Sequence, residues 1–223
     1  FLPLLMNSLS SSLYLFIRSH SIYTAHEYIA KYGSDLKGAT ICGTTGVWPD
    51  LDASIKDVSK LVEEGKGEES DPTLGGKLMG WMFSRCDEGV KLGNEWICDS
   101  PYVQNDHAQD PFDAFTKPTS NRAWLYFLQM MEDITGPEWA AKVPKELPIY
   151  NIAGDQDPVG QFGTGVYQTA NWLIDTGHKV KTVLYTGYRH EIHNYSDIKE
   201  DVDSRFAFGW CDNLKTMSVY ALT

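Results

Sequence analysis

Short apolar runs alternate with helical stretches at both ends of the chain, and this alternation constrains the fold more than any other feature. The first run is rich in aromatic residues and is typical of a strand buried on both faces. The expected strands are residues 12–17, 39–42, 147–153 and 180–185, and the expected helices are residues 20–32, 165–176 and 198–214. Strands that alternate with helices predict an α/β fold with a parallel, doubly wound sheet.

A long segment between these two ends has mostly helical spacing and interrupts the alternation. Much of its aromatic content is tryptophan, at Trp48, Trp81, Trp96, Trp124 and Trp139. We therefore expect a partial sheet core in residues 1–44, a helical insertion over the carboxyl edge of the sheet in residues 45–146, and the second half of the core in residues 147–223.

The charge balance excludes several classes of partner. The chain has 19 basic and 30 acidic side chains, which gives a formal net charge of −11. Such a surface repels phosphate backbones and anionic membranes, so we expect no nucleic-acid binding. The apolar opening, residues 1–17, is too short and polar to span a membrane and lacks the features of a signal peptide. We expect no stable membrane insertion and interpret this opening as the middle of a domain.

The cysteines and histidines do not indicate a metal or redox centre. The four cysteines are scattered without a C-x-x-C pair, which is typical of reduced thiols and favours a cytoplasmic protein. His190 and His193, in H-E-I-H, do not match the zinc-binding H-E-x-x-H spacing, and Gly160, Gly163 and Gly165 do not form G-x-G-x-x-G. The sequence therefore predicts no metal and no nucleotide cofactor, and it gives no indication of an oligomeric state.

Three residue types suited to nucleophilic catalysis follow the expected strands. Ser19 lies between the first strand and a helix, Asp155 and Asp157 follow the third strand, and His190 follows the fourth. Because the carboxyl ends of parallel strands meet at one edge of the sheet, these side chains are expected to converge. The order Ser, Asp, His is that of α/β-hydrolases.

Each of these residues has a plainer interpretation when taken alone. A serine before a helix is commonly a helix N-cap, an aspartate before proline is commonly a turn residue, and a lone histidine is commonly a surface residue. The coincidence of all three at strand ends, in the right order, favours catalysis. In that case His190 accepts the proton of Ser19, and the carboxylate orients the imidazole.

Several segments resemble one family of hydrolases. L-F-I-R-S-H-S at 15–21 resembles the family's L-F-G-H-S-M-G, and L-K-G-A-T-I-C-G-T at 36–44 resembles its L-x-G-A-I-L-S-G-T. G-D-Q-D-P-V-G at 154–160 and Y-T-G-Y-R-H-E-I at 185–192 are similar to its G-D-x-D-P-V-G and Y-x-G-x-R-H-E-I. W-I-C-D-S at 96–100 loosely resembles W-L-S-R-D, and Asp110, Pro111 and Phe115 fit D-P-x-x-x-F. These motifs are typical of the serine-aminopeptidase-S33 group, which includes monoacylglycerol lipases and bacterial lysophospholipases.

The resemblance implies an α/β-hydrolase fold, with a partial parallel sheet, flanking helices and the insertion as a helical lid. It implies Ser19 as nucleophile, Asp157 rather than Asp155 as acid and His190 rather than His193 as base, with the backbone N–H of His20 in the oxyanion hole. The implied reaction is hydrolysis of a small acyl ester or lipid, such as a monoacylglycerol or lysophospholipid, through an acyl-enzyme and without a cofactor. Peptide hydrolysis is a subsidiary option. The aromatic residues of the lid either form only its core or also line an acyl-chain pocket.

Two departures from the family pattern leave a second hypothesis open. Ile17 and Ser21 stand where the family has glycines beside the nucleophile, at positions where strand and helix pass closely. The strands that precede the nucleophile in the family, and the loop that supplies a second oxyanion donor, are not in the sequence. The alternative is a hydrolase-like protein that has lost turnover and binds a lipid or a partner.

Overall fold

The sheet has four parallel strands whose spatial order follows the chain. The computed structural model describes residues 13–18, 21–83, 93–111 and 118–202, and the statements below concern these residues. The strands are β1 (Leu13–Arg18), β2 (Leu36–Cys42), β3 (Ile149–Gly154) and β4 (Val180–Tyr185), in the order β1-β2-β3-β4. The parallel α/β sheet predicted from the alternation is therefore confirmed.

Strand boundaries differ slightly from the predicted ones, for local reasons. β2 begins at Leu36 rather than residue 39, because Leu36 pairs with Leu13 before an irregularity in the register. β3 begins after Pro148, which has no N–H to donate, although its carbonyl accepts from the backbone N–H of Ala39 at 3.0 Å. β3 lies between β2 and β4 and is buried along its whole length.

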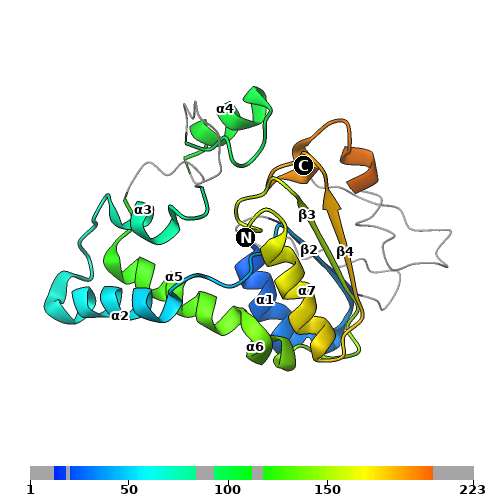
Figure 1. Cartoon of the computed structure of the whole chain (residues 1–223), viewed down its shortest axis with the longest axis horizontal. Helices are drawn as coiled ribbons and strands as arrows, with labels where there is room; N and C mark the ends of the chain where they lie inside the picture. The colour runs from blue at the N-terminus through cyan, green and yellow to red at the C-terminus, as the bar shows by residue number, and fades with distance from the viewer. Residues whose placement is uncertain (1–12, 19–20, 84–92, 112–117, 203–223) are drawn as a thin grey trace.

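The helices that connect the paired strands cover one face of the sheet. α1 (Ser21–Tyr32) joins β1 to β2, and α7 (Thr164–Asp175) joins β3 to β4, as Figure 1 shows. Both crossovers advance in the same direction along the sheet, so right-handed connections place both helices on the same side. The main core fills the space between this face and the helices.

The segment predicted as an insertion, residues 45–146, contains several helices that lie in different places. Its helices are α2 (Leu51–Leu61), a π-helical turn (Val62–Lys66), α3 (Leu74–Met79), α4 (Pro101–Gln109), α5 (Asn121–Ile134) and α6 (Gly136–Lys142). α2 packs on α5, α5 packs on α1, and α6 contacts both α1 and α7. α4 lies near the ends of the strand arrows in Figure 1, whereas α2 and α5 extend to the side of the helix layer.

The second face of the sheet carries a smaller apolar cluster. Its buried members are Cys42, Tyr150, Ile152, Tyr185, Ile192 and Val202. Val202 belongs to the closing helix predicted over 198–214, of which residues 199–202 are helical and residues 203–214 lie outside the described part. The loop after β4 contains a 3-10 turn (Ile192–Asn194), which packs Ile192 into this cluster.

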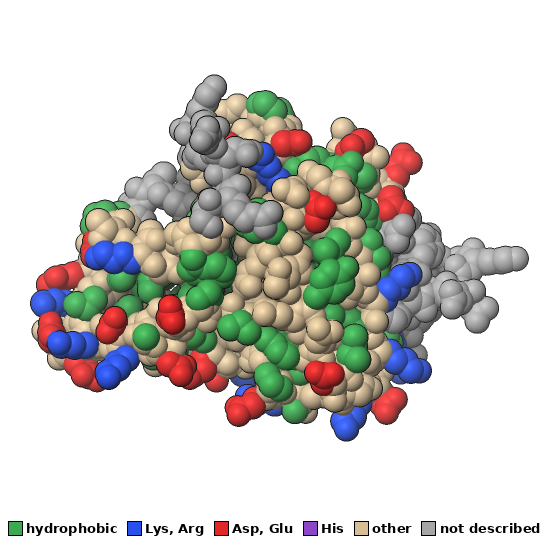
Figure 2. All heavy atoms as spheres, viewed as in Figure 1, with side chains coloured by type: hydrophobic (Ala, Val, Ile, Leu, Met, Phe, Trp, Pro, Cys, Tyr) green, Lys and Arg blue, Asp and Glu red, His purple; other side chains and the backbone are tan. Residues whose placement is uncertain are grey.

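The surface carries both signs of charge. Figure 2 shows acidic and basic side chains interspersed at the α2 end of the molecule, where Glu64 pairs with Lys66 and Glu68 pairs with Arg122. In the ranges that the structure describes, no helix is both long and apolar enough to cross a membrane.

Candidate active site

Asp157 is held in the turn that follows β3. Its side chain is fully buried, and its Oδ1 accepts a hydrogen bond of 2.9 Å from the backbone N–H of Val159. The carbonyl of Asp157 accepts from the N–H of Phe162, also at 2.9 Å. These bonds fix the direction of the carboxylate and leave Oδ2 for another partner.

That partner is His190, in the loop that follows β4. The Nδ1 atom of His190 lies 2.9 Å from Oδ2 of Asp157, and both side chains are buried. Because an ionised carboxylate can only accept, Nδ1 carries the hydrogen and donates it to Asp157. Nε2 is then the nitrogen that can accept a proton from another group.

The electrostatic surroundings favour the protonated imidazole. Burial alone lowers the pKa of His190, but the charge of Asp157 and its hydrogen bond raise it, with a smaller contribution from Glu191. The net effect places the pKa of His190 above its ordinary value of 6.5. A buried histidine paired with a carboxylate in this way is suited to accept and return a proton.

The two loops are joined to each other by backbone hydrogen bonds. The N–H of Asp155 donates to the carbonyl of Tyr185 at 2.9 Å, and the N–H of Gln156 donates to that of Tyr188 at 2.9 Å. A Cβ on Gly154 would lie 1.9 Å from the Tyr188 carbonyl oxygen, so this crossing requires glycine. Asp155 accepts from the N–H of Gly187 at 2.7 Å, so it holds the turn, and Asp157 is the aspartate that contacts His190.

The loop after β2 packs against the imidazole of His190, and the sequence did not predict this contact. Gly43 has a φ of +80°, and a Cβ there would lie 2.8 Å from Cε1 of His190. The imidazole therefore packs directly against the backbone of this loop. Gly43 was visible in the family-like strand motif, but the motif did not indicate that it contacts the base.

A buried polar cluster around His26 supports the loop after β2. Nδ1 of His26 in α1 donates to the carbonyl of Ile134 at 3.0 Å, and its Nε2 accepts from the hydroxyl of Thr44 at 3.0 Å. The ring of His26 stacks on Trp139 with centroids 4.3 Å apart. Burial lowers the pKa of His26 to about 4, so this histidine is neutral near pH 7. Thr44 directly follows Gly43, so the cluster fixes the loop that contacts His190.

The insertion, which was expected over this edge of the sheet, contacts the pair through residues that the sequence did not single out for this role. The ring of Trp96 lies 5.2 Å from that of His190, centroid to centroid, at an angle of 49°. The N–H of Glu191 donates to the carbonyl of Ile97 at 2.8 Å. The W-I-C-D-S motif contains Trp96 and Ile97, and it was the signal that could have indicated this contact.

The structure brings together two of the four predicted site residues. Ser19 and His20 lie outside the described residues, so their predicted roles remain predictions. The described part of β1 ends at Arg18, which is in register with Cys42, and α1 begins at Ser21. His193, the alternative base, lies in the 3-10 turn at Ile192–Asn194.

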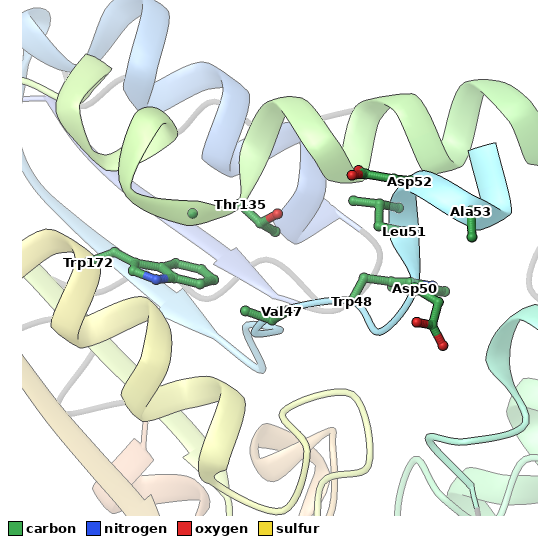
Figure 3. A pocket seen from close by; sticks show the side chains of 9 residues that line it. Val47, Trp48, Asp50, Leu51, Asp52, Ala53, Thr135 and Trp172 are labelled. Atoms are coloured by element: carbon green, nitrogen blue, oxygen red, sulfur yellow. The ribbon is translucent and has the colours of Figure 1, made fainter. Parts of the chain in front are cut away.

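A separate cavity of about 460 Å³ opens beside the helix layer (Figure 3). Its lining is Val47, Trp48, Asp50, Leu51, Asp52, Ala53, Thr135, Gly136 and Trp172. Asp157 and His190 are not among the described residues that line it. Within the described residues, no group of three or more His, Cys, Asp or Glu side chains is arranged to hold a metal ion.

Solved structures resemble this chain closely. A highly thermostable carboxyl esterase from Bacillus coagulans, solved with glycerol, is 48% identical, with a TM-score of 0.82 over 88% of this chain and 64% of the esterase. A lipase in an open form is 28% identical, with a TM-score of 0.73 over 86% of this chain and 62% of the lipase. The chain thus spans less than two thirds of the length of either protein.

A more distant structure agrees on the fold. A soluble variant of the monoglyceride lipase from Saccharomyces cerevisiae is 16% identical, with a TM-score of 0.53 over 85% of this chain and 61% of the lipase. No protein-family model and no curated protein matches the sequence. The chain has the α/β-hydrolase fold, as the sequence predicted, and the proteins that it resembles in structure include esterases and lipases.

Proposed function

We propose that this chain carries the catalytic residues of a serine hydrolase that cleaves carboxylic esters, with monoacylglycerols or lysophospholipids as substrates. The observation that carries the proposal is the buried hydrogen bond between Asp157 and His190, at the carboxyl ends of two neighbouring parallel strands. The 48% identity to a carboxyl esterase supports ester hydrolysis as the reaction class.

In the proposed reaction, Oγ of Ser19 attacks the ester carbonyl while its proton passes to Nε2 of His190. The backbone N–H of His20 donates to the oxyanion, and Asp157 remains ionised and stabilises the imidazolium. The imidazolium then protonates the departing alcohol, which leaves an acyl-enzyme on Ser19. Water, deprotonated by His190, hydrolyses this ester, releases the fatty acid and restores the serine.

The chain connectivity supports Ser19 as the nucleophile. Arg18 is in register with Cys42, and the residue after Cys42, Gly43, packs against the ring of His190. Paired strands lie about 4.8 Å apart, and consecutive Cα atoms are about 3.8 Å apart. This neighbourhood of the end of β1 supports the choice of Ser19, which follows Arg18 in the sequence, as the nucleophile.

A second candidate function is a hydrolase-like protein that binds a lipid or a partner without turnover. Ile17 and Ser21 favour it, because they occupy positions that the resembled family fills with glycine. The intact pair of Asp157 and His190 favours the enzyme instead, because a binding protein does not require a carboxylate-oriented base.

A fluorophosphonate probe distinguishes these two functions. We expect covalent labelling of the folded chain that is lost in Ser19→Ala and kept in Ser34→Ala. Ser34 is exposed in the 3-10 turn before β2, at the opposite end of that strand from Gly43. Circular dichroism establishes that both variants are folded. Folded protein that takes no label would reject the enzyme and favour the binding protein.

Hydrolysis assays then test the substrate class. We expect release of fatty acid from monoacylglycerol or lysophospholipid and no cleavage of peptide substrates, with the activity lost in Ser19→Ala. Labelling without turnover of either lipid would retain the serine hydrolase and reject this substrate class.

A further inference from the structure

The loop that carries His190 is bound by a short segment of the insertion, residues 94–99. The N–H of Glu191 donates to the carbonyl of Ile97 at 2.8 Å, and that of His190 approaches the carbonyl of Trp96 at 3.5 Å. The guanidinium of Arg189 donates to the carbonyl of Glu95. Three consecutive residues of the base loop therefore contact three consecutive residues of the insertion.

A tyrosine joins the same two segments a second time. The hydroxyl of Tyr195 accepts from the N–H of Asp99 at 3.1 Å and from the N–H of Arg189 at 3.2 Å. Because one hydroxyl serves both backbones, the two segments cannot separate without losing these bonds. Tyr195 is itself buried beside the 3-10 turn that follows the base loop.

The segment is also anchored to α4 of the insertion. The side chain of Asn94 donates to the carbonyl of Gln104 at 2.7 Å, and the side chain of Gln104 donates to the carbonyl of Cys98 at 2.8 Å. Ile97 and Cys98 are buried between these contacts. Hydrogen bonds on both sides of residues 95–97, at Asn94 and at Cys98, therefore fix this stretch relative to α4.

Trp96 is the side chain through which this segment meets the imidazole. Its ring lies 5.2 Å from that of His190, while Asp157 holds the Nδ1 edge and Gly43 abuts Cε1. The ring of His190 is thus confined by a carboxylate, a backbone turn and an indole from three different parts of the chain. Of these, the indole comes from the insertion.

We propose that Trp96 is a positioning residue for His190, and that residues 94–99 form a clamp through which the insertion sets the orientation of the base. Trp96 acts through the imidazole and not on the substrate. The assignment of His190 as the base rests on the proposed function, but the orientation and titration of its ring do not.

The test is nuclear magnetic resonance of the His190 ring in the full chain, because it does not require activity. In the unaltered protein we expect a downfield Nδ1 proton that is shared with Asp157. In Trp96→Ala we expect this resonance to broaden or disappear, and the pKa of His190 to rise, because water reaches a face of the ring that burial now protects. The charged groups around the ring, Asp157, Glu191 and Arg189, are unchanged by this substitution.

Three further variants complete the test. Trp124→Ala removes another tryptophan of the insertion, one that contacts Phe127, and we expect it to leave the His190 resonance unchanged. Trp96→Phe retains an aromatic ring and should restore most of the signal. Arg189→Gln weakens the bond to the Glu95 carbonyl and should act in the same direction as Trp96→Ala, with a smaller effect.

Turnover provides a second readout. We expect kcat of Trp96→Ala to fall about ten- to a hundredfold with little change in KM, because misplacement of a base by about 1 Å costs this order of rate. An unchanged His190 resonance and pKa in folded Trp96→Ala, or an equal change in Trp124→Ala, overturns the proposal. If Trp96→Ala does not fold, an unaltered resonance in Arg189→Gln overturns it. A changed resonance in a protein that the fluorophosphonate does not label retains the clamp and rejects only the proposed enzyme.

Discussion

The carboxylate of Asp157 has two separate effects on His190, and one substitution removes both. It receives the Nδ1 hydrogen, which fixes the tautomer, and its charge raises the pKa of the ring. In Asp157→Asn we expect kcat to fall by about 10³- to 10⁴-fold, because the tautomer that presents a free Nε2 is no longer enforced. Steady-state hydrolysis of an activated ester measures this loss.

The pH dependence of the same variant has a defined sign. His190 acts as a base only when it is neutral, so kcat/KM of the unaltered chain rises with pH through a pKa above 6.5. Without the charge of Asp157, burial outweighs the smaller contribution of Glu191, and the midpoint of the profile moves to lower pH. A midpoint that stays in place in Asp157→Asn would contradict the role of this carboxylate.

Gly43 is the glycine whose added Cβ would meet the imidazole of His190. In Gly43→Ala we expect a loss of about 1–3 kcal/mol in the free energy of unfolding, because alanine is strained at a φ of +80° and its Cβ meets the imidazole. We also expect kcat to fall, because the ring must shift. Urea denaturation and ester hydrolysis measure the two effects.

Gly76→Ala is the matched control, because no atom beyond the neighbouring backbone of its own helix lies within 4 Å of a Cβ at that position. We expect it to leave activity unchanged and stability equal or slightly higher. Equal behaviour of the two variants would show that the packing of Gly43 against His190 does not constrain the site.

The sequence predicted the residues that meet in the site better than the residues that hold them there. Asp157 and His190 follow strands, and the rule that the carboxyl ends of parallel strands share an edge is sufficient to bring them together. Gly43, Thr44 and Trp96 contact or support the base through loops and through the insertion. No periodic pattern encodes such contacts, because they depend on how distant segments pack.

The core elements were predicted closely because each has a pattern of its own. β4 has the bounds that its sequence pattern predicted. α1 begins one residue later than predicted, and α7 begins and ends one residue earlier. The insertion was predicted as helical, but not which helix packs where. The spacing of its aromatic residues predicts helices with one apolar face. It does not say whether that face packs on α1, as α5 does, or on another helix of the insertion.

His26 lies in α1 and contacts three other parts of the fold, and its burial makes their packing sensitive to acid. The ring contacts α5 through Ile134, the loop after β2 through Thr44, and α6 through Trp139. Its pKa is about 4 in the folded chain against 6.5 for an ordinary histidine. The unfolded chain therefore binds a proton more readily, and stability falls as the pH drops from 6.5 towards 4.

We expect this histidine to account for a loss of about 3 kcal/mol across that range, at about 1.4 kcal/mol per pH unit. His190 contributes with the opposite sign, because its raised pKa stabilises the fold at low pH and that stabilisation is lost as the pH rises through its folded pKa. Urea denaturation at pH 7 and pH 4.5 measures the sum. His26→Gln keeps a donor and an acceptor but does not titrate, so its stability should fall less over the same range, and an equal fall would contradict the assignment.

The charge of the whole molecule selects among substrates that fit the same site. A net charge of −11 creates a negative potential that repels anionic esters, although pairs such as Glu68 and Arg122 are locally balanced. The range of this potential falls from about 30 Å at 0.01 M salt to about 8 Å at 0.15 M salt. Salt therefore acts on the encounter with the substrate and not on the buried pair of Asp157 and His190.

We expect kcat/KM for an anionic ester to rise several-fold between these two salt concentrations, while that for a neutral ester with the same acyl chain stays nearly constant. A cationic ester should show the opposite trend, because salt screens attraction in the same way as it screens repulsion. Since the chemical step is common to all three, kcat should be similar and the difference should appear in KM. A parallel response of the three esters to salt would show that the field of the whole molecule does not govern access to the site, and that local groups around the entrance do.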